Sequence, residues 1–135
     1  MRLWVQRHAK LRHAIGLAPL IALASPIERA EAACAPASPV DNATVECTGA
    51  TTDQNGANGY GSGGFATPSD NGNTYNIVSG ASLTGTRIGL LFGRALVINN
   101  FGTITGGSVD GVRGTQGVVN NFGVISGGRS GVDIF

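Results

Sequence analysis

The sequence predicts an all-β protein: a right-handed parallel β-helix, a solenoid with turns of about 21 residues. The turns follow a signal peptide and a disulfide-bearing, Gly/Asn-rich N-terminal segment. Three observations carry this prediction, namely a repeat of short fixed period, β-branched residues without helical periodicity, and two cysteines behind an export signal. A short fixed period is typical of solenoids, in which each repeat contacts only its neighbours.

The chain begins with a segment typical of a secretory signal peptide. Basic residues up to Arg12 precede an apolar run over residues 14–24, and small residues follow. This run has eleven residues, whereas a helix needs about 20 to span a bilayer. We therefore expect residues 1–32 to be removed, with cleavage between Ala32 and Ala33.

Two cysteines follow the expected cleavage site. Cys34 and Cys47 are the only cysteines in the chain, and export to an oxidising compartment permits them to pair. A lipid-modified Cys34 is not expected, because residues 31–33 lack the aliphatic residue that such a site normally needs. We predict a disulfide. Catalytic thiol chemistry is not expected, because no histidine follows residue 32 to activate either sulfur.

Residues 33–73 are expected to form an N-terminal segment and a Gly-rich loop. Within residues 48–74, Gly, Asn, Ser and Thr predominate, and little is available for burial. Residues 59–64 formally match the dinucleotide-binding fingerprint. However, no strand leads into this motif, and Pro68 follows where a helix would begin, so we expect no cofactor.

Residues 74–135 are expected to form an incomplete β-helix of three turns. Residues 97–107 and 118–128 are near copies, and residues 77–85 keep the same apolar and small positions one period earlier. Apolar residues recur at steps of 6 and then 7 or 8, so each turn has three sides, each closed by Gly, Asn, Ser or Thr. The expected inward sets are Ile77, Leu83 and Leu90; Ile98, Ile104 and Val112; and Val119, Ile125 and Val132.

Like residues at equivalent positions of the repeat predict rows of side chains between neighbouring turns. Such rows are structural features, because directly opposite residues on paired strands interact through their side chains. The predicted pairs are Asn99 with Asn120, Asn100 with Asn121, Phe101 with Phe122, and Arg113 with Asp133. The last of these is an exposed ion pair, and such a pair contributes little to stability.

The residues after the leader give little support for catalysis or metal binding. They include no histidine or lysine, and strand alternation should send Asp110 and Asp133 to opposite faces. Residues 106–111 resemble a calcium-binding nonapeptide in one copy only, with its middle glycine replaced, and favour a simple turn. We expect no enzymatic activity, no metal site and no cofactor.

The charge of the chain also argues against a nucleic-acid partner. Without residues 1–32 the chain has four arginines and six acidic residues, a net charge of about −2. Nucleic-acid binders cluster lysine and arginine to meet the phosphate backbone. No lysine follows Lys10, so we expect no nucleic acid among the partners.

In these features the chain resembles the bacterial autotransporters, the outer-membrane β-barrel autotransporter family. The leader, the Cys34 and Cys47 pair running into residues 48–55, and the Asn-Asn-Phe-Gly-x-Ile-x-Gly-Gly turns carry the resemblance. It implies an N-terminal passenger segment that is non-enzymatic, structural or adhesive, and directed at a host or cell-surface ligand. It also implies an outer-membrane translocator barrel in the full-length protein.

The sequence up to Phe135 contains no aromatic-rich alternating strands of the kind that a barrel requires. We therefore expect a truncated passenger, at the cell surface or outer membrane when full length and periplasmic or secreted as given. The alternatives are a secreted β-helical carbohydrate-binding or polysaccharide-degrading protein, or a non-functional gene fragment. Aligned carboxylates in further turns would favour a carbohydrate-active protein, and a barrel-coding region downstream would favour the passenger.

Overall fold

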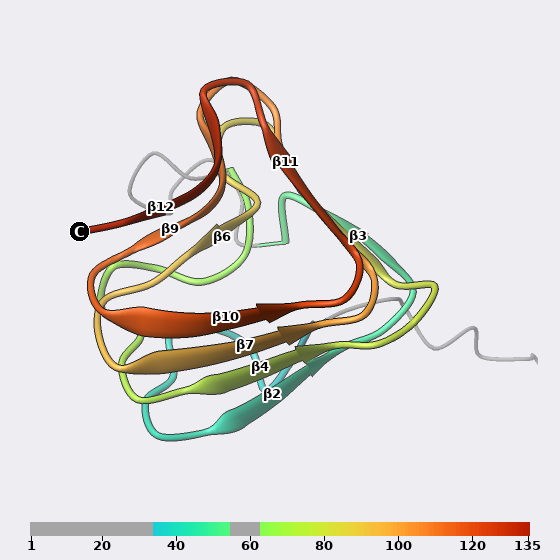
Figure 1. Ribbon diagram of the computed structural model, residues 1–135. Coiled ribbons are helices and arrows are strands. Elements are labelled where there is room, and N and C mark those ends of the chain that lie inside the picture. Colours follow the sequence, from blue (N-terminus) through green and yellow to red (C-terminus); the bar gives the residue numbers. More distant parts are fainter. Residues whose placement is uncertain (1–33, 55–62) are drawn as a thin grey trace, which may run out of the picture.

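The computed structural model describes residues 34–54 and 63–135 and confirms an all-β parallel β-helix (Figure 1). The expected cleavage site at Ala32 and Ala33 lies outside the described residues. In the described part of the chain, no helix is long and apolar enough to cross a membrane. The strands are β1 (Cys34–Ala35), β2 (Thr44–Cys47), β3 (Ala50–Thr52), β4 (Thr74–Ile77), β5 (Ser82–Gly85), β6 (Leu90–Leu91), β7 (Leu96–Asn100), β8 (Thr103–Gly106), β9 (Asp110–Gly114), β10 (Gly117–Asn121), β11 (Val124–Gly127) and β12 (Ser130–Ile134).

Three sheets form the three sides of the coil, as Figure 1 shows. The first side has the order β1-β2-β4-β7-β10, the second β3-β5-β8-β11 and the third β6-β9-β12. Among the described strands, every pairing between successive turns is parallel, and only β1 runs antiparallel to its neighbour β2. Parallel pairing in register places equivalent residues of successive turns directly above one another.

The core consists of inward side chains stacked in three columns. Most of them are fully buried, whereas the members from the last turn are partly exposed, with Val132 at 41%. From the first turn to the last, the columns are Val45, Tyr75, Ile98 and Val119 on the first side; Thr51, Leu83, Ile104 and Ile125 on the second; and Phe65, Leu90, Val112 and Val132 on the third.

The predicted place of Ile77 in the first column is wrong. Tyr75 lies opposite Ile98, and Ile77 lies opposite Asn100. The reason is the corner that follows β4: residues 78–81 separate β4 from β5, whereas only residues 101–102 separate β7 from β8. A shift of two residues keeps every side chain on the same face, so Ile77 is still buried but sits at the corner.

The prediction of a loop over residues 48–74 is also wrong in part, because this segment contributes to an additional turn of the coil. Strand β3 pairs with β5, and Phe65 forms an isolated parallel bridge with Leu90. The inward residue of β3 is Thr51, which is polar, and Phe65 stands alone among small and polar residues. This turn therefore lacks the apolar spacing that identifies the later turns.

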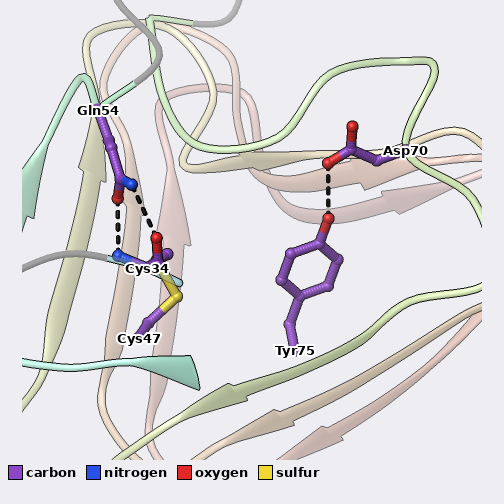
Figure 2. Close-up of a disulfide and its surroundings, with 5 residues drawn as sticks. All are labelled: Cys34, Cys47, Gln54, Asp70 and Tyr75. Carbon is purple, nitrogen blue, oxygen red and sulfur yellow. Dashed lines mark hydrogen bonds between the residues drawn. A yellow bond between two sulfur atoms is a disulfide. The ribbon is translucent and has the colours of Figure 1, made fainter. Parts of the chain in front are cut away.

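Strand β1 covers part of the N-terminal edge of the first side, opposite Glu46 and Cys47 of β2. Cys34 and Cys47 are direct partners in the antiparallel ladder and form a disulfide, with their Cα atoms 3.9 Å apart. The side-chain amide of Gln54 accepts from the Cys34 backbone N–H (2.8 Å) and donates to the Cys34 carbonyl oxygen (2.9 Å; Figure 2). These bonds satisfy backbone groups that an edge strand would otherwise expose.

Replacing both cysteines, as Cys34→Ser with Cys47→Ser, is expected to lower the free energy of unfolding by about 3 kcal/mol. The cross-link joins residues 13 apart in sequence, and closing a loop of this size restricts mainly the unfolded chain. Urea unfolding of the purified, disulfide-bonded protein measures the effect. A variant with an unchanged midpoint and slope would show that the disulfide contributes nothing to stability.

Candidate functional site

The third side, together with the corner that leads from β11 into β12, gathers most of the charged residues of the later turns. Leu91, Arg113 and Asp133 occupy equivalent outward positions in β6, β9 and β12. The predicted pairing of Arg113 with Asp133 is confirmed, because the Nε of Arg113 lies 3.8 Å from Oδ2 of Asp133. A contact of this length between half-buried groups contributes little to stability.

Arg129 is the centre of this charge cluster. It donates to both carboxylate oxygens of Asp110, with Nε 3.0 Å from Oδ1 and Nη2 2.6 Å from Oδ2. The same Nη2 lies 2.6 Å from Oδ2 of Asp133. The hydrogen bonds to Asp110 raise the pKa of Arg129 further above its usual range, so it remains a cation and pairs with the fully buried Asp110 side chain.

Strand alternation was expected to send Asp110 and Asp133 to opposite faces, but it does not keep their carboxylates apart, because both contact Arg129. Asp110 is the first residue of β9 and sits at a corner of the coil, where strand alternation does not yet fix the direction of a side chain. Arg129 follows β11 and reaches both acids. The two carboxylates thus serve as the ion-pair partners of Arg129.

A groove of about 680 Å³ opens beside the cluster on the same side of the coil. Its lining includes the buried side chains of Leu91 and Phe92 and the exposed ring of Phe135. Arg113 also lines it, with its guanidinium carbon 5.6 Å from the centre of the Phe135 ring. Arg87 provides a second cation to the groove. The volume falls within the range of roughly 300–1,000 Å³ that is typical of small-molecule sites.

A second polar cluster is buried on the inner side of the first sheet, around Asp70. This carboxylate is 1% exposed and accepts hydrogen bonds from the hydroxyls of Ser38 (2.7 Å), Thr67 (3.0 Å) and Tyr75 (2.8 Å) and from the backbone N–H of Val40 (3.3 Å). Figure 2 shows the bond from Tyr75. Four neutral donors surround the buried charge. The cluster thereby ties residues 38–40 to the second turn.

The alkaline pH dependence of stability is expected to depend on Tyr75. Burial of the Tyr75 hydroxyl raises its pKa above the ordinary value of 10.0. Deprotonation is therefore harder in the folded than in the unfolded chain. The contribution of protonated Tyr75 to the free energy of unfolding is fully present below about pH 10. As the pH rises further, this contribution is lost by up to about 1.4 kcal/mol per pH unit.

Urea unfolding at a series of alkaline pH values, for wild type and Tyr75→Phe, measures this dependence. The wild-type free energy of unfolding should fall more steeply with pH than that of the variant, because one extra proton is released on unfolding. Parallel curves would mean that Tyr75 ionises equally well in both states.

The predicted rows of side chains between turns are confirmed. The side-chain amide of Asn120 donates to Asn99 (2.9 Å), and that of Asn99 donates in turn to Asn76 (2.9 Å). The sequence prediction did not include Asn76, because its neighbours differ from those of the later repeats. The amide of Asn100 donates to Asn121 (2.7 Å), and the rings of Phe101 and Phe122 stack with centroids 5.0 Å apart.

The remaining motifs have simple structural outcomes. The formal dinucleotide fingerprint at residues 59–64 lies mostly outside the described residues. Residues 107–109 form the short turn between β8 and β9 that the sequence favoured over a calcium site, and Asp110 at its end is bound by Arg129. Over residues 34–54 and 63–135, no group of three or more His, Cys, Asp or Glu is placed to hold a metal ion.

Three groups of residues were not identified from the sequence: the ion-pair network of Arg129, the Asp70 cluster, and the groove beside Arg87. Their members are far apart in the chain and come together only through the coil. Comparison with known proteins found no matching family model, no matching curated protein and no matching solved structure. The functional conclusion therefore depends on the geometry of the three sides.

Proposed function

We propose that this chain is an exported, non-enzymatic passenger segment that acts by display, in a structural or adhesive role like that of autotransporter passengers. In this proposal the stacked turns present repeating outer surfaces to a host or cell-surface ligand. A translocator barrel encoded by further sequence would carry the segment to the outer membrane.

The observation that supports display best is the row of amides on the outer face of the first side. Asn76, Asn99 and Asn120 lie in register on β4, β7 and β10, and each is hydrogen bonded to the next. Hydrogen bonding along the row fixes side chains that would otherwise lose rotamer entropy on binding. A repeated, pre-ordered surface of this kind suits attachment to an extended partner.

The polar groups inside the described residues support a structural role in a second way. Asp70 and Asp110 are both buried, and each accepts several hydrogen bonds from the chain itself. A polysaccharide-degrading β-helix would need neighbouring carboxylates available for proton transfer or metal binding. The ion pairs of Asp110 and Asp133 with Arg129 favour the passenger role over that alternative.

The disulfide and the leader support export. Disulfides persist mainly in oxidising compartments such as the periplasm or the cell surface. The bond between Cys34 and Cys47 fastens β1 to β2 at the N-terminal edge of the first side. If the whole passenger, including its N-terminal segment, is exported, an N-terminal end that resists fraying and edge-to-edge strand pairing would benefit it.

Bead adhesion tests the proposal. The full chain, purified from the periplasm after export, is coupled to beads, and their retention on epithelial monolayers and on bacterial lawns is counted under flow. Beads with the same protein after reduction and alkylation provide the control. Retention that requires the oxidised protein supports display. The proposal fails if neither surface retains the beads, or if the protein releases reducing sugars from polysaccharides.

A further inference from the structure

We propose that the groove on the third side is a binding site for a small organic anion, namely an aromatic carboxylate. The carboxylate would be bound by Arg87 and Arg113, and the aromatic body would rest against the apolar lining around Phe135. This site goes beyond the proposed display function, because it takes a soluble small molecule instead of a surface.

The two arginines of the groove have unused hydrogen-bonding capacity. Within the described residues, the side chain of Arg87 forms no ion pair. Arg113 approaches Asp110 and Asp133 only at 3.8 Å, while both acids make their short contacts with Arg129. The guanidinium groups of Arg87 and Arg113 can therefore donate to an incoming carboxylate, which is the partner that the planar fork of arginine fits best.

The rest of the lining determines the body of the ligand. Ile88, Leu91, Phe92 and Pro68 contribute apolar side chains, and the Phe135 ring is 67% exposed. Aromatic rings pair well with one another in offset or edge-on arrangements. A flat apolar group next to the carboxylate of the ligand would cover this surface, whereas a simple ion such as acetate would leave it exposed to water.

The backbone of the groove favours a small molecule over an extended peptide. The N–H groups of Leu91, Phe92, Gly93, Thr115 and Phe135 all donate to carbonyl oxygens of the chain. A peptide strand binds by pairing its backbone with free groups at a sheet edge, and these groups are occupied. Recognition in this groove is thus left to side chains, mainly to the two cations.

The test is an NMR titration of the exported full chain with 2-naphthoate, followed through backbone amide signals. The amides of Gly93, Gly114 and Thr115, which line the groove, should shift and saturate with a Kd of about 1 mM, the strength expected for a ligand of this size. The neutral analogue 2-naphthamide should bind at least about fivefold more weakly, because it lacks the charge.

Matched arginine variants locate the site. Arg87→Gln should weaken binding of 2-naphthoate about fivefold, because it removes one charged donor from the groove. Arg94→Gln, an equal loss of charge at an exposed position outside the groove lining, should leave the Kd unchanged. Circular dichroism of both variants verifies the fold.

Any of the following results would overturn the proposal: shifts that do not saturate, shifts centred on the exposed Phe101 and Phe122 stack, equal binding of 2-naphthamide, or equal weakening by the two variants. Tighter binding of hexaglutamate than of 2-naphthoate would also overturn it, since the site would then belong to an acidic peptide. None of these results bears on bead adhesion, so the display function is tested separately.

Discussion

Gly85→Ala is expected to lower the free energy of unfolding by about 3 kcal/mol or more. A Cβ added at Gly85 would lie 1.8 Å from the carbonyl oxygen of Ile88 and 2.9 Å from the Cα of Gly64. Both obstacles are backbone atoms, so no side chain can move aside to relieve the clash. The corner between the second and third sides would have to open. Urea unfolding measures the loss.

The control is Gly131→Ala in β12. There the nearest atom to an added Cβ is the carbonyl oxygen of Ile125 at 3.2 Å, a contact that a small shift relieves, and the cost should stay within about 1 kcal/mol. If Gly85→Ala is as well tolerated as Gly131→Ala, the close approach of the backbones at this corner does not exist.

Asp70→Ala is expected to lower the free energy of unfolding by about 3 kcal/mol or more, because it removes the acceptor that several buried donors share. The hydroxyls of Ser38, Thr67 and Tyr75 would each lose a bond to the carboxylate. Tyr75 is fully buried, so its hydroxyl is cut off from replacement by bulk water. Urea unfolding and the temperature midpoint both report the change.

Two further variants grade this effect. Tyr75→Phe removes one donor and keeps the ring, so it should cost about 1–2 kcal/mol. Asp41→Ala, at an exposed position where the carboxylate accepts from Asn71, should cost less than about 1 kcal/mol. Equal losses from Asp70→Ala and Asp41→Ala would mean that burial of the Asp70 cluster does not contribute to the stability of the second turn.

The sequence predicted those parts of the fold that depend on exact repetition. Residues 97–107 and 118–128 are near copies, and a stack in register brings their like residues into contact. The amide rows and the Phe101–Phe122 stack follow directly. The repeated glycines near the end of each copy have the same origin, because Gly85, Gly106 and Gly127 lie in register at a tight corner.

The sequence did not predict the earliest turn, because its inward positions do not carry the repeating apolar pattern. Thr51 takes a place that Leu83 and Ile104 fill in the later turns, and its hydroxyl is buried with no partner among the described residues. The order of the first column was missed for a related reason. Two additional residues in the corner after β4 shift Tyr75, and not Ile77, opposite Ile98.

The sequence also did not predict most of the charge cluster on the third side, namely the contacts of Arg129 with Asp110 and Asp133. Strand alternation assigns directions only within a strand, and Asp110 and Arg129 lie at corners. The length of the arginine side chain then lets Arg129 contact acids on two levels of the coil. The groove is hidden for the same reason, since Arg87, Arg113 and Phe135 belong to three successive turns.

The most direct test of the parallel coil is a methyl and aromatic NOESY experiment on the purified, disulfide-bonded protein. We predict contacts between successive turns: the Tyr75 ring with Ile98, and Ile104 with both Leu83 and Ile125. Ile98 methyl signals should also be shifted by the ring current of Tyr75. Contacts confined to residues close in sequence, with none between turns, would contradict the β-helix and the proposal of display that depends on it.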